Sequence, residues 1–209
     1  MDANNHNDKI PVDDENIKNY MIKKIIGKGE FCDVYKAINR NTKQVVALKR
    51  LKIRQIQNAQ TRIECLREIQ VLRRLNHPNI IKHLESFNSF NEIYIVLEYA
   101  DAGDLSKMIN YLRFKNELLS EMAIVNFFNQ ICEALDYMHR NLIMHRDIKP
   151  ANVLIKKNRT IKLADFGFSR ILSPSKMNVI TLVGTPYYMA PERLDKLNYS
   201  FPADIWSMG

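Results

Sequence analysis

Short apolar runs separated by polar turns fill the first hundred residues. The runs are too short for helices, and glycine or asparagine follows several of them, so each predicts a β-strand. They lie at residues 20–26, 34–38, 44–49, 82–87 and 93–98. Because strands joined by short turns pair with their neighbours, we predict a mostly antiparallel sheet.

One helical segment interrupts the strands at about residues 61–75. Apolar side chains recur there at steps of three, which predicts a single apolar stripe along the helix. The stripe consists of Ile63, Leu66, Ile69 and Leu72. His77 and Pro78 end the segment, since proline cannot continue a helix.

The second half of the chain has a helical pattern. Asp104 and Ser120 are of the residue types that cap helix N-termini, so we predict helices from Leu105 and from Ser120 to about Asn141. The longer helix has a wide apolar face, formed by Ile124, Phe127, Phe128, Ile131, Leu135 and Met138. Two short strands follow at residues 153–155 and 161–164.

These patterns predict an α+β chain of two lobes. Residues 1–17 are rich in Asn and Asp, which predicts a disordered tail. We expect a first lobe over residues 18–100 and a mostly helical second lobe over 101–209. The seam near residues 99–103 is the kind of place where ligands often bind.

Composition and charge exclude several classes of protein. The 209 residues contain 31 Lys and Arg against 23 Asp and Glu, but the basic residues are scattered, so we expect no nucleic-acid partner. No apolar run approaches the roughly 18 residues of a membrane span, and no secretory signal is visible. Cys32, Cys65 and Cys132 lie far apart, which indicates neither disulfides nor zinc. A reducing compartment, cytoplasm or nucleus, is expected.

A glycine-containing turn joins the first two predicted strands. Gly27 and Gly29 would let backbone N–H groups approach phosphate oxygens, although a plain hairpin turn is the alternative. Cys32 stands where the third glycine of GxGxxG would be. Because the turn leads into a strand and not a helix, it suits a flap over a nucleotide better than a dinucleotide-binding site.

Lys49 ends the third apolar strand. A buried lysine needs a partner, so Lys49 either reaches solvent or pairs with a carboxylate. Glu68 and Glu64 on the predicted helix are both candidates for that partner. In the functional interpretation, Lys49 also contacts the phosphates of a nucleotide.

The most specific motif is HRDIKPAN at residues 145–152. Asp147 can orient or deprotonate an attacking hydroxyl, and Lys149 can neutralise a transferring phosphoryl group. Asn152 can ligate Mg²⁺ through its amide oxygen. Asp165, in an Asp-Phe-Gly triplet 18 residues after Asp147, offers a second hard oxygen ligand.

These motifs, followed by GTPYYMAPE at residues 184–192, resemble the signature set of the eukaryotic protein kinases. The similarity runs from about residue 20 to residue 209. Lys149, together with Gly184 and Thr185, resembles the serine/threonine class. The strings LEYADAGDLS at 97–106 and LVGTPYYM at 182–189 resemble the NIMA-related kinases, and most of all their short members.

The resemblance implies a bilobal kinase that transfers the γ-phosphoryl group of ATP to Ser or Thr of protein substrates, with Mg²⁺. It assigns catalysis to Asp147, Lys149, Lys49 and Glu68, and the metal to Asn152 and Asp165. It assigns ATP binding to Ile26, Gly27, Lys28, Gly29, Val34, Ala47, Lys49, Leu97, Glu98 and Ala100. The adenine would lie at Glu98 and Ala100, with Leu97 as gatekeeper.

The resemblance also implies a cellular role and a switch. NIMA-related kinases act in mitotic progression and in microtubule or centrosome organisation, so we expect a cytoplasmic, nuclear, spindle or centrosomal location. Thr181 stands where related kinases carry an activating phosphosite, and Ser175 is the next candidate. An upstream kinase would add the phosphate, and Arg146 would bind it, with Arg170 as a second partner.

The end of the sequence suggests a second interpretation. Ser200, Pro202 and Asp204 predict the start of a helix that Gly209 interrupts. In the family, this helix is the buried axis of the larger lobe, so we expect a chain truncated within that lobe. The alternative to an active kinase is therefore a weak or inactive fragment that acts as a binding module. The intact catalytic set favours the enzyme.

Overall fold

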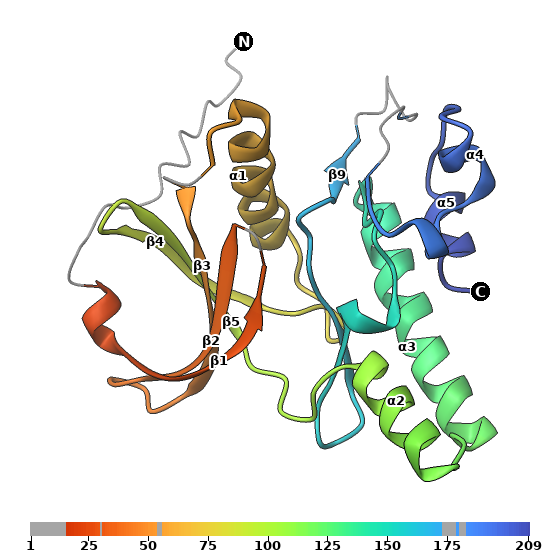
Figure 1. Cartoon of the computed structure of the whole chain (residues 1–209), viewed down its shortest axis with the longest axis horizontal. Coiled ribbons are helices and arrows are strands. Elements are labelled where there is room, and N and C mark those ends of the chain that lie inside the picture. Colours follow the sequence, from red (N-terminus) through yellow and green to blue (C-terminus); the bar gives the residue numbers. More distant parts are fainter. Residues whose placement is uncertain (1–15, 30, 54–55, 173–178, 180–182) are drawn as a thin grey trace. The chain divides into compact units, whose positions relative to one another are not determined.

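The computed structural model describes residues 16–29, 31–53, 56–172, 179 and 183–209, without the side chains of residues 60, 61 and 64 (Figure 1). The predicted tail lies mostly outside the described residues. The predicted phosphosites Ser175 and Thr181 also lie outside them, and so does the side chain of Glu64, the alternative partner for Lys49. The chain divides into two compact units, residues 1–62 with 83–99 and residues 63–82 with 100–209. The predicted first lobe, 18–100, therefore includes residues 63–82 and Ala100, which belong to the second unit.

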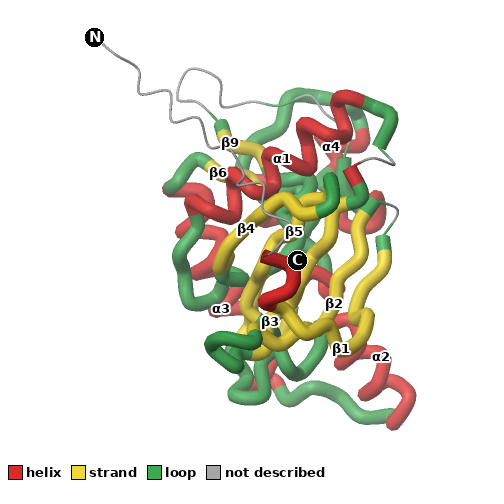
Figure 2. Tube along the Cα trace, turned by 90° about the vertical axis from the view of Figure 1, so that its left-hand side faces the viewer, coloured by secondary structure: helices red, strands yellow, loops and turns green. Residues whose placement is uncertain are grey.

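The first unit contains a five-stranded antiparallel sheet in the order β1-β2-β3-β5-β4, drawn in yellow in Figure 2. Its strands are β1 (Tyr20–Lys28), β2 (Cys32–Asn39), β3 (Val45–Leu51), β4 (His83–Ser89) and β5 (Glu92–Glu98). The antiparallel sheet of the predicted α+β fold class is thus confirmed. All five strands were predicted, within a few residues at their ends.

An apolar cluster covers one region of this sheet. Tyr20, Ala37, Val46, Leu48, Phe87, Tyr94 and Val96 form it. Ile17, in the short 3-10 helix η1 (Asn16–Asn19), packs against the same cluster. The last two residues of the predicted disordered tail are therefore ordered, because an apolar side chain there finds a buried surface.

Helix α1 (Ala59–Arg74) occupies the predicted position, but the predicted stripe is wrong in its first half. Ile69 and Leu72 are buried, whereas Ile63 and Leu66 are exposed. A helix turns about 100° per residue, so steps of three drift by about 60° each. After three such steps, Ile63 and Leu72 lie on opposite sides of the helix.

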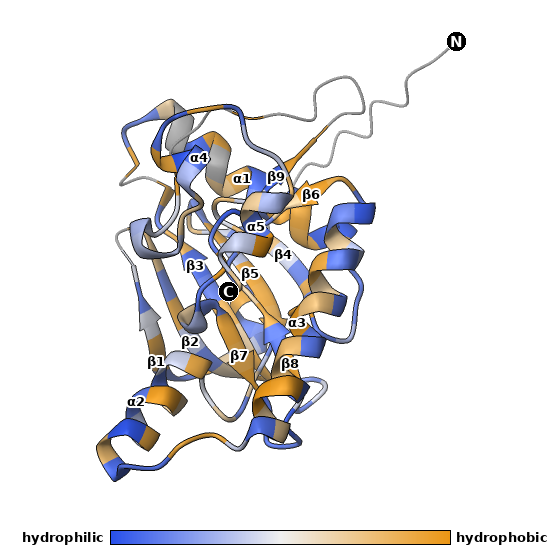
Figure 3. Ribbon diagram, turned by 90° about the vertical axis from the view of Figure 1, so that its right-hand side faces the viewer, coloured by the Kyte–Doolittle hydropathy of each residue, from blue (hydrophilic) through white to orange (hydrophobic). Residues whose placement is uncertain are grey.

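Two capped helices come first in the part of the second unit that follows residue 100. Asp104 caps α2 (Leu105–Lys115) by accepting a hydrogen bond from the Lys107 N–H at 2.8 Å, and Ser120 caps α3 (Glu121–Arg140). Figure 3 shows how apolar and polar residues alternate along α3. Four of its six predicted core residues are buried, together with Ala134. Ile124 and Phe128 are exposed.

Short elements complete the second unit. The predicted strands form a hairpin, β7 (Val153–Ile155) with β8 (Ile161–Leu163). No pattern in the sequence predicted the two-residue strands β6 (Ile143–Met144) and β9 (Arg170–Ile171), which pair with each other. The remaining elements are η3 (Pro150–Asn152), η4 (Pro186–Tyr188), α4 (Pro191–Leu194) and α5 (Pro202–Trp206). Within the described ranges, no helix is long and apolar enough to cross a membrane.

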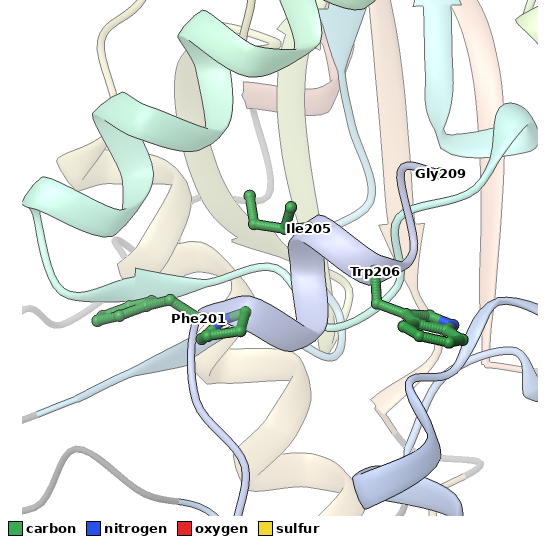
Figure 4. Close-up of a pocket in the computed structure, with 5 residues that line it drawn as sticks. Phe201, Ile205, Trp206 and Gly209 are labelled. Carbon is green, nitrogen blue, oxygen red and sulfur yellow. The ribbon is translucent and has the colours of Figure 1, made fainter.

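An apolar pocket of about 740 Å³ lies beside α5 (Figure 4). Its lining residues are Phe201, Pro202, Ile205, Trp206 and Gly209. None of these side chains is an acid, a base or a metal ligand, so the pocket supplies no catalytic chemistry.

Candidate active site

The carboxylate of Asp147 is held at both oxygens. Thr185 donates from Oγ1 to Oδ1 at 2.8 Å, and Asn152 donates from Nδ2 to Oδ2 at 2.9 Å. Lys149 Nζ lies 2.7 Å from Oδ2 and also donates to Thr185 Oγ1 at 2.7 Å. Asp147 is 4% exposed, so these partners, and not water, fix its orientation.

The predicted metal ligands Asn152 and Asp165 come from adjacent backbone segments. Ala164 donates its N–H to the carbonyl of Asn152 at 2.9 Å, which brings Asp165, the next residue, beside it. Asn152 directs Nδ2 to the carbonyl and carboxylate of Asp147, so its Oδ1 is the atom suited to a metal. An exposed carboxylate and an amide oxygen fit Mg²⁺, which prefers oxygen ligands.

His145 links the two halves of this site. Its Nδ1 accepts the N–H of Asp147 at 3.3 Å, so Nε2 carries the proton and donates to the carbonyl of Ala164 at 3.1 Å. The ring is fully buried against Phe166, and burial lowers the pKa of His145. A neutral imidazole therefore ties the backbone of Asp147 to the residue before Asp165.

Asp204 anchors the loop that carries Asp147. Its carboxylate, at the start of α5, accepts the N–H of His145 at 2.9 Å and the N–H of Arg146 at 2.8 Å. His139 on α3 lies 3.0 Å from the same carboxylate. Burial by itself would raise the pKa of Asp204, but the hydrogen bonds from His139 and the loop hold the pKa below its usual value.

The residues assigned to ATP in the first unit lie on adjacent strands. Val34 is opposite both Gly27 and Lys49, and Ala47 is opposite Leu97. Glu98 ends β5, and Ile26 and Lys28 lie on β1. The sheet therefore gathers most of the predicted nucleotide-binding positions.

A backbone hydrogen bond joins Gly29, in the glycine motif after β1, to the first residue of β2. Gly29 donates its N–H to the carbonyl of Cys32 at 2.7 Å. A Cβ at Gly29 would lie 3.1 Å from the Cys32 sulfur, so a larger residue would have to push that side chain aside. Ala100 and Glu68 belong to the second unit, and the pairing of Lys49 with Glu68 stays a prediction.

The family description "Protein kinase domain" matches residues 20–209. The chain belongs to the protein kinase family. It is 37% identical to the serine/threonine-protein kinase Nek3 of Mus musculus over 191 residues, which are 91% of this chain and 36% of that protein. It is also 37% identical to Nek1 of Mus musculus, over 88% of this chain and 15% of that protein.

Kinases with other names match at a similar level. The chain is 36% identical to the serine/threonine-protein kinase pakA of Dictyostelium discoideum, over 97% of this chain and 16% of that protein. The predicted similarity to NIMA-related kinases is confirmed by Nek3 and Nek1. The chain spans about a third of the length of Nek3 and less of the other two relatives.

Arg146, the predicted phosphate partner of this kinase chain, is buried in a basic cluster. Its backbone has φ 68°, and its guanidinium donates to the carbonyl of Phe168 and to the hydroxyl of Tyr199. Burial lowers the pKa of Arg146, and the nearby Arg170 and Arg193 act in the same direction. Thr181 and Ser175 lie outside the described residues, so the regulatory prediction stays a prediction.

Sequence reasoning assigned no role in the site to His145, Asp204, Tyr199 or Arg193. His145 belongs to the HRD motif, and that membership was its only signal. Asp204 was interpreted as a residue of a helix start. In the structure its partners lie 58 to 65 positions earlier in the chain. No local pattern in the sequence marks a contact of that range.

Proposed function

We propose that this chain is the ATP- and Mg²⁺-binding part of a serine/threonine protein kinase. The reaction is transfer of the γ-phosphoryl group of ATP to a Ser or Thr hydroxyl of a protein substrate. The observation that carries the proposal is the buried Asp147 carboxylate, oriented by Thr185, Asn152 and Lys149. Family membership supports it, because protein kinases in general use ATP and Mg²⁺.

The roles of the residues follow from their positions. Asp147 accepts the proton of the substrate hydroxyl or orients that hydroxyl for attack. Lys149, held between Asp147 and Thr185, places a positive charge where the transferred phosphoryl group gains negative charge. Lys49 would position the phosphates from the sheet of the first unit, with Glu68 as its partner.

Asn152 and Asp165 are the residues that would hold Mg²⁺. The bound ion would neutralise phosphate charge as it develops. The chain prepares this site by turning the Asn152 amide so that Nδ2 is engaged by Asp147. His145 contributes by joining the backbone of Asp147 to that of Ala164.

The serine/threonine class and the cellular role rest on resemblance. The relatives Nek3, Nek1 and pakA are named serine/threonine-protein kinases, which supports Ser and Thr as acceptors. The NIMA-related character supports a role in mitotic progression and in microtubule or centrosome organisation. We propose a cytoplasmic location on the same basis, extending to the nucleus, the spindle or the centrosome.

We also propose that an upstream kinase activates the chain by phosphorylating Thr181. The phosphate would pair with Arg146 and Arg170, since a phosphothreonine carries a charge of about −1.5 to −2. The test compares wild type with Thr181→Ala after treatment with an upstream kinase. We expect activation of wild type alone. Equal activation of Thr181→Ala would move the switch to another residue, with Ser175 tested next.

Asp147→Asn tests the central assignment. We expect phosphoryl transfer to a Ser/Thr substrate protein to fall by about 10²–10⁴-fold, since this is the usual contribution of a general base. ATP affinity, measured by calorimetry, should stay within about twofold, because Asp147 addresses the hydroxyl and not the nucleotide.

The matched control for Asp147→Asn is Asp136→Asn, the same change at an exposed α3 residue that pairs with Arg140. Full transfer activity in Asp147→Asn would overturn the assignment. Wild type that binds ATP with Mg²⁺ but transfers no phosphoryl group would instead favour the alternative, a binding module without turnover.

A further inference from the structure

Arg193 is a buried charge that the proposed mechanism does not use. It lies on α4, immediately after Pro191 and Glu192, and is 2% exposed. Among the described residues, no carboxylate forms an ion pair with it, and its Nε has no hydrogen-bond partner. Burying a guanidinium without a carboxylate is unfavourable, so the contacts that it does make require an explanation.

The guanidinium of Arg193 is placed by two groups. Its Nη2 donates to the carbonyl of Val183. Its Cζ lies 5.0 Å from the centre of the Tyr199 ring, the distance of a cation–π contact. The hydroxyl of the same tyrosine accepts a hydrogen bond from Arg146 at 3.3 Å. Tyr199 therefore fixes two arginines, one on its face and one at its hydroxyl.

The segment that Arg193 holds leads directly to Asp147. Gly184 follows Val183, and a Cβ there would lie 2.5 Å from the carbonyl oxygen of Arg146 and 3.2 Å from Arg193 Nη2. The segment is thus pressed between the catalytic loop and the guanidinium. The next residue, Thr185, donates to the Asp147 carboxylate and accepts from Lys149.

We propose that Arg193 is a positioning residue for phosphoryl transfer. It holds residues 183–185 against the catalytic loop through the Val183 carbonyl, and it thereby sets the place of the Thr185 hydroxyl. The inference rests on the proposed kinase function, since it names a further residue of the same site. It accounts for a buried arginine without a carboxylate: the guanidinium binds a backbone carbonyl and an aromatic face.

Two substitutions of Arg193 test this role in the full chain. Arg193→Met keeps a long unbranched side chain and removes every donor. We expect kcat to fall by about tenfold or more, because misplacement near a reacting centre by about 1 Å can cost 10²-fold. The KM for ATP should stay within about twofold, since no contact to the nucleotide is proposed for Arg193. Arg193→Lys restores one donor but not the planar stacking, so kcat should be intermediate.

The matched control is Arg140→Met, the same change at an α3 arginine whose side chain is 79% exposed. We expect wild-type kcat and KM for this variant. All kinetic measurements are made well below each melting temperature. An unchanged kcat in Arg193→Met would overturn the proposal.

A double variant separates positioning from general packing. If Arg193 acts through Thr185, Arg193→Met in a Thr185→Val background should lower kcat by less than about twofold beyond Thr185→Val alone. Independent contributions would multiply instead, and a full further tenfold loss in the double variant would contradict the proposal.

Hydrogen exchange gives a readout that does not depend on activity. Backbone amides of residues 183–188 should exchange faster in Arg193→Met than in wild type and in Arg140→Met, while those of β2 and β3 should be unchanged. An inactive wild type with this exchange pattern would refute the kinase function alone. Unchanged exchange at residues 183–188 would refute the role of Arg193.

Discussion

The sheet of the first unit and the catalytic loop of the second are held by different kinds of side chain. In the sheet, an apolar cluster that includes Leu48 and Phe87 joins the strands. In the loop, buried polar groups hold the backbone and the side chains in place. Asp204 accepts three hydrogen bonds, and Asp147 is held by three partners. Apolar burial is strong but non-directional, whereas hydrogen bonds fix the position of individual atoms.

This difference suggests a division of tasks. The apolar cluster supplies stability, and the polar network supplies the geometry that the proposed phosphoryl transfer would require. Substitutions in the two regions should therefore separate melting temperature from turnover.

The largest effect on stability is expected from Leu48→Ala. Leu48 is fully buried on β3, and truncating a core leucine typically costs about 2–5 kcal/mol. Thermal unfolding should show this loss. Well below the lowered melting temperature, kcat should stay within about twofold of wild type, because no group of the catalytic loop has moved. A tenfold fall of kcat in Leu48→Ala would show that the apolar cluster also sets the geometry of the catalytic loop.

A smaller loss of stability, with a larger loss of turnover, is expected from Asp204→Asn. The amide keeps the shape of the carboxylate but presents one acceptor oxygen to the backbone N–H groups of His145 and Arg146. A buried donor left without a partner costs about 1–3 kcal/mol. The urea midpoint measures that loss, and kcat should fall more than it does in Leu48→Ala. Wild-type kcat in Asp204→Asn would show that the anchor is only structural.

We expect the free energy of unfolding to depend on pH as well, with a smaller effect than that of the two substitutions. Burial lowers the pKa of His145 and of His77. The unfolded chain, with histidine pKa near 6.5, then binds more protons than the folded chain as the pH falls through that value. Stability that is present above about pH 6.5 is lost on acidification, because proton binding then favours the unfolded chain. NMR should show the His145 ring neutral in the folded chain at pH 6, and a charged ring would contradict its assignment as a neutral link.

The sequence predicted the local features of both regions well. The strands and the caps Asp104 and Ser120 depend on residues a few positions apart, so their patterns can be recognised in one sequence. The α1 stripe was wrong in part because steps of three do not follow the true helical period. Asp147, Lys149 and Asn152 were found because the motif keeps them within six residues, and the structure brings their side chains together.

The supporting network was not predictable in the same way. Asp204 meets His145 across 59 positions, and Arg193 lies over the ring of Tyr199 after the chain has turned between them. Such contacts exist only after the second unit has folded. A buried arginine, moreover, has the sequence signature of a surface residue, since arginine is rarely buried.

The geometric role of the polar network is measured by kcat and melting temperature determined together for Thr185→Val. The substitution keeps the shape of the side chain and removes the hydroxyl that Asp147 and Lys149 share. If the polar network serves geometry, kcat should fall by about tenfold or more while the melting temperature stays within about 4 °C of wild type, a change of roughly 1 kcal/mol or less. An unchanged kcat, or a loss of kcat no greater than in Leu48→Ala, would contradict a geometric role of the polar network.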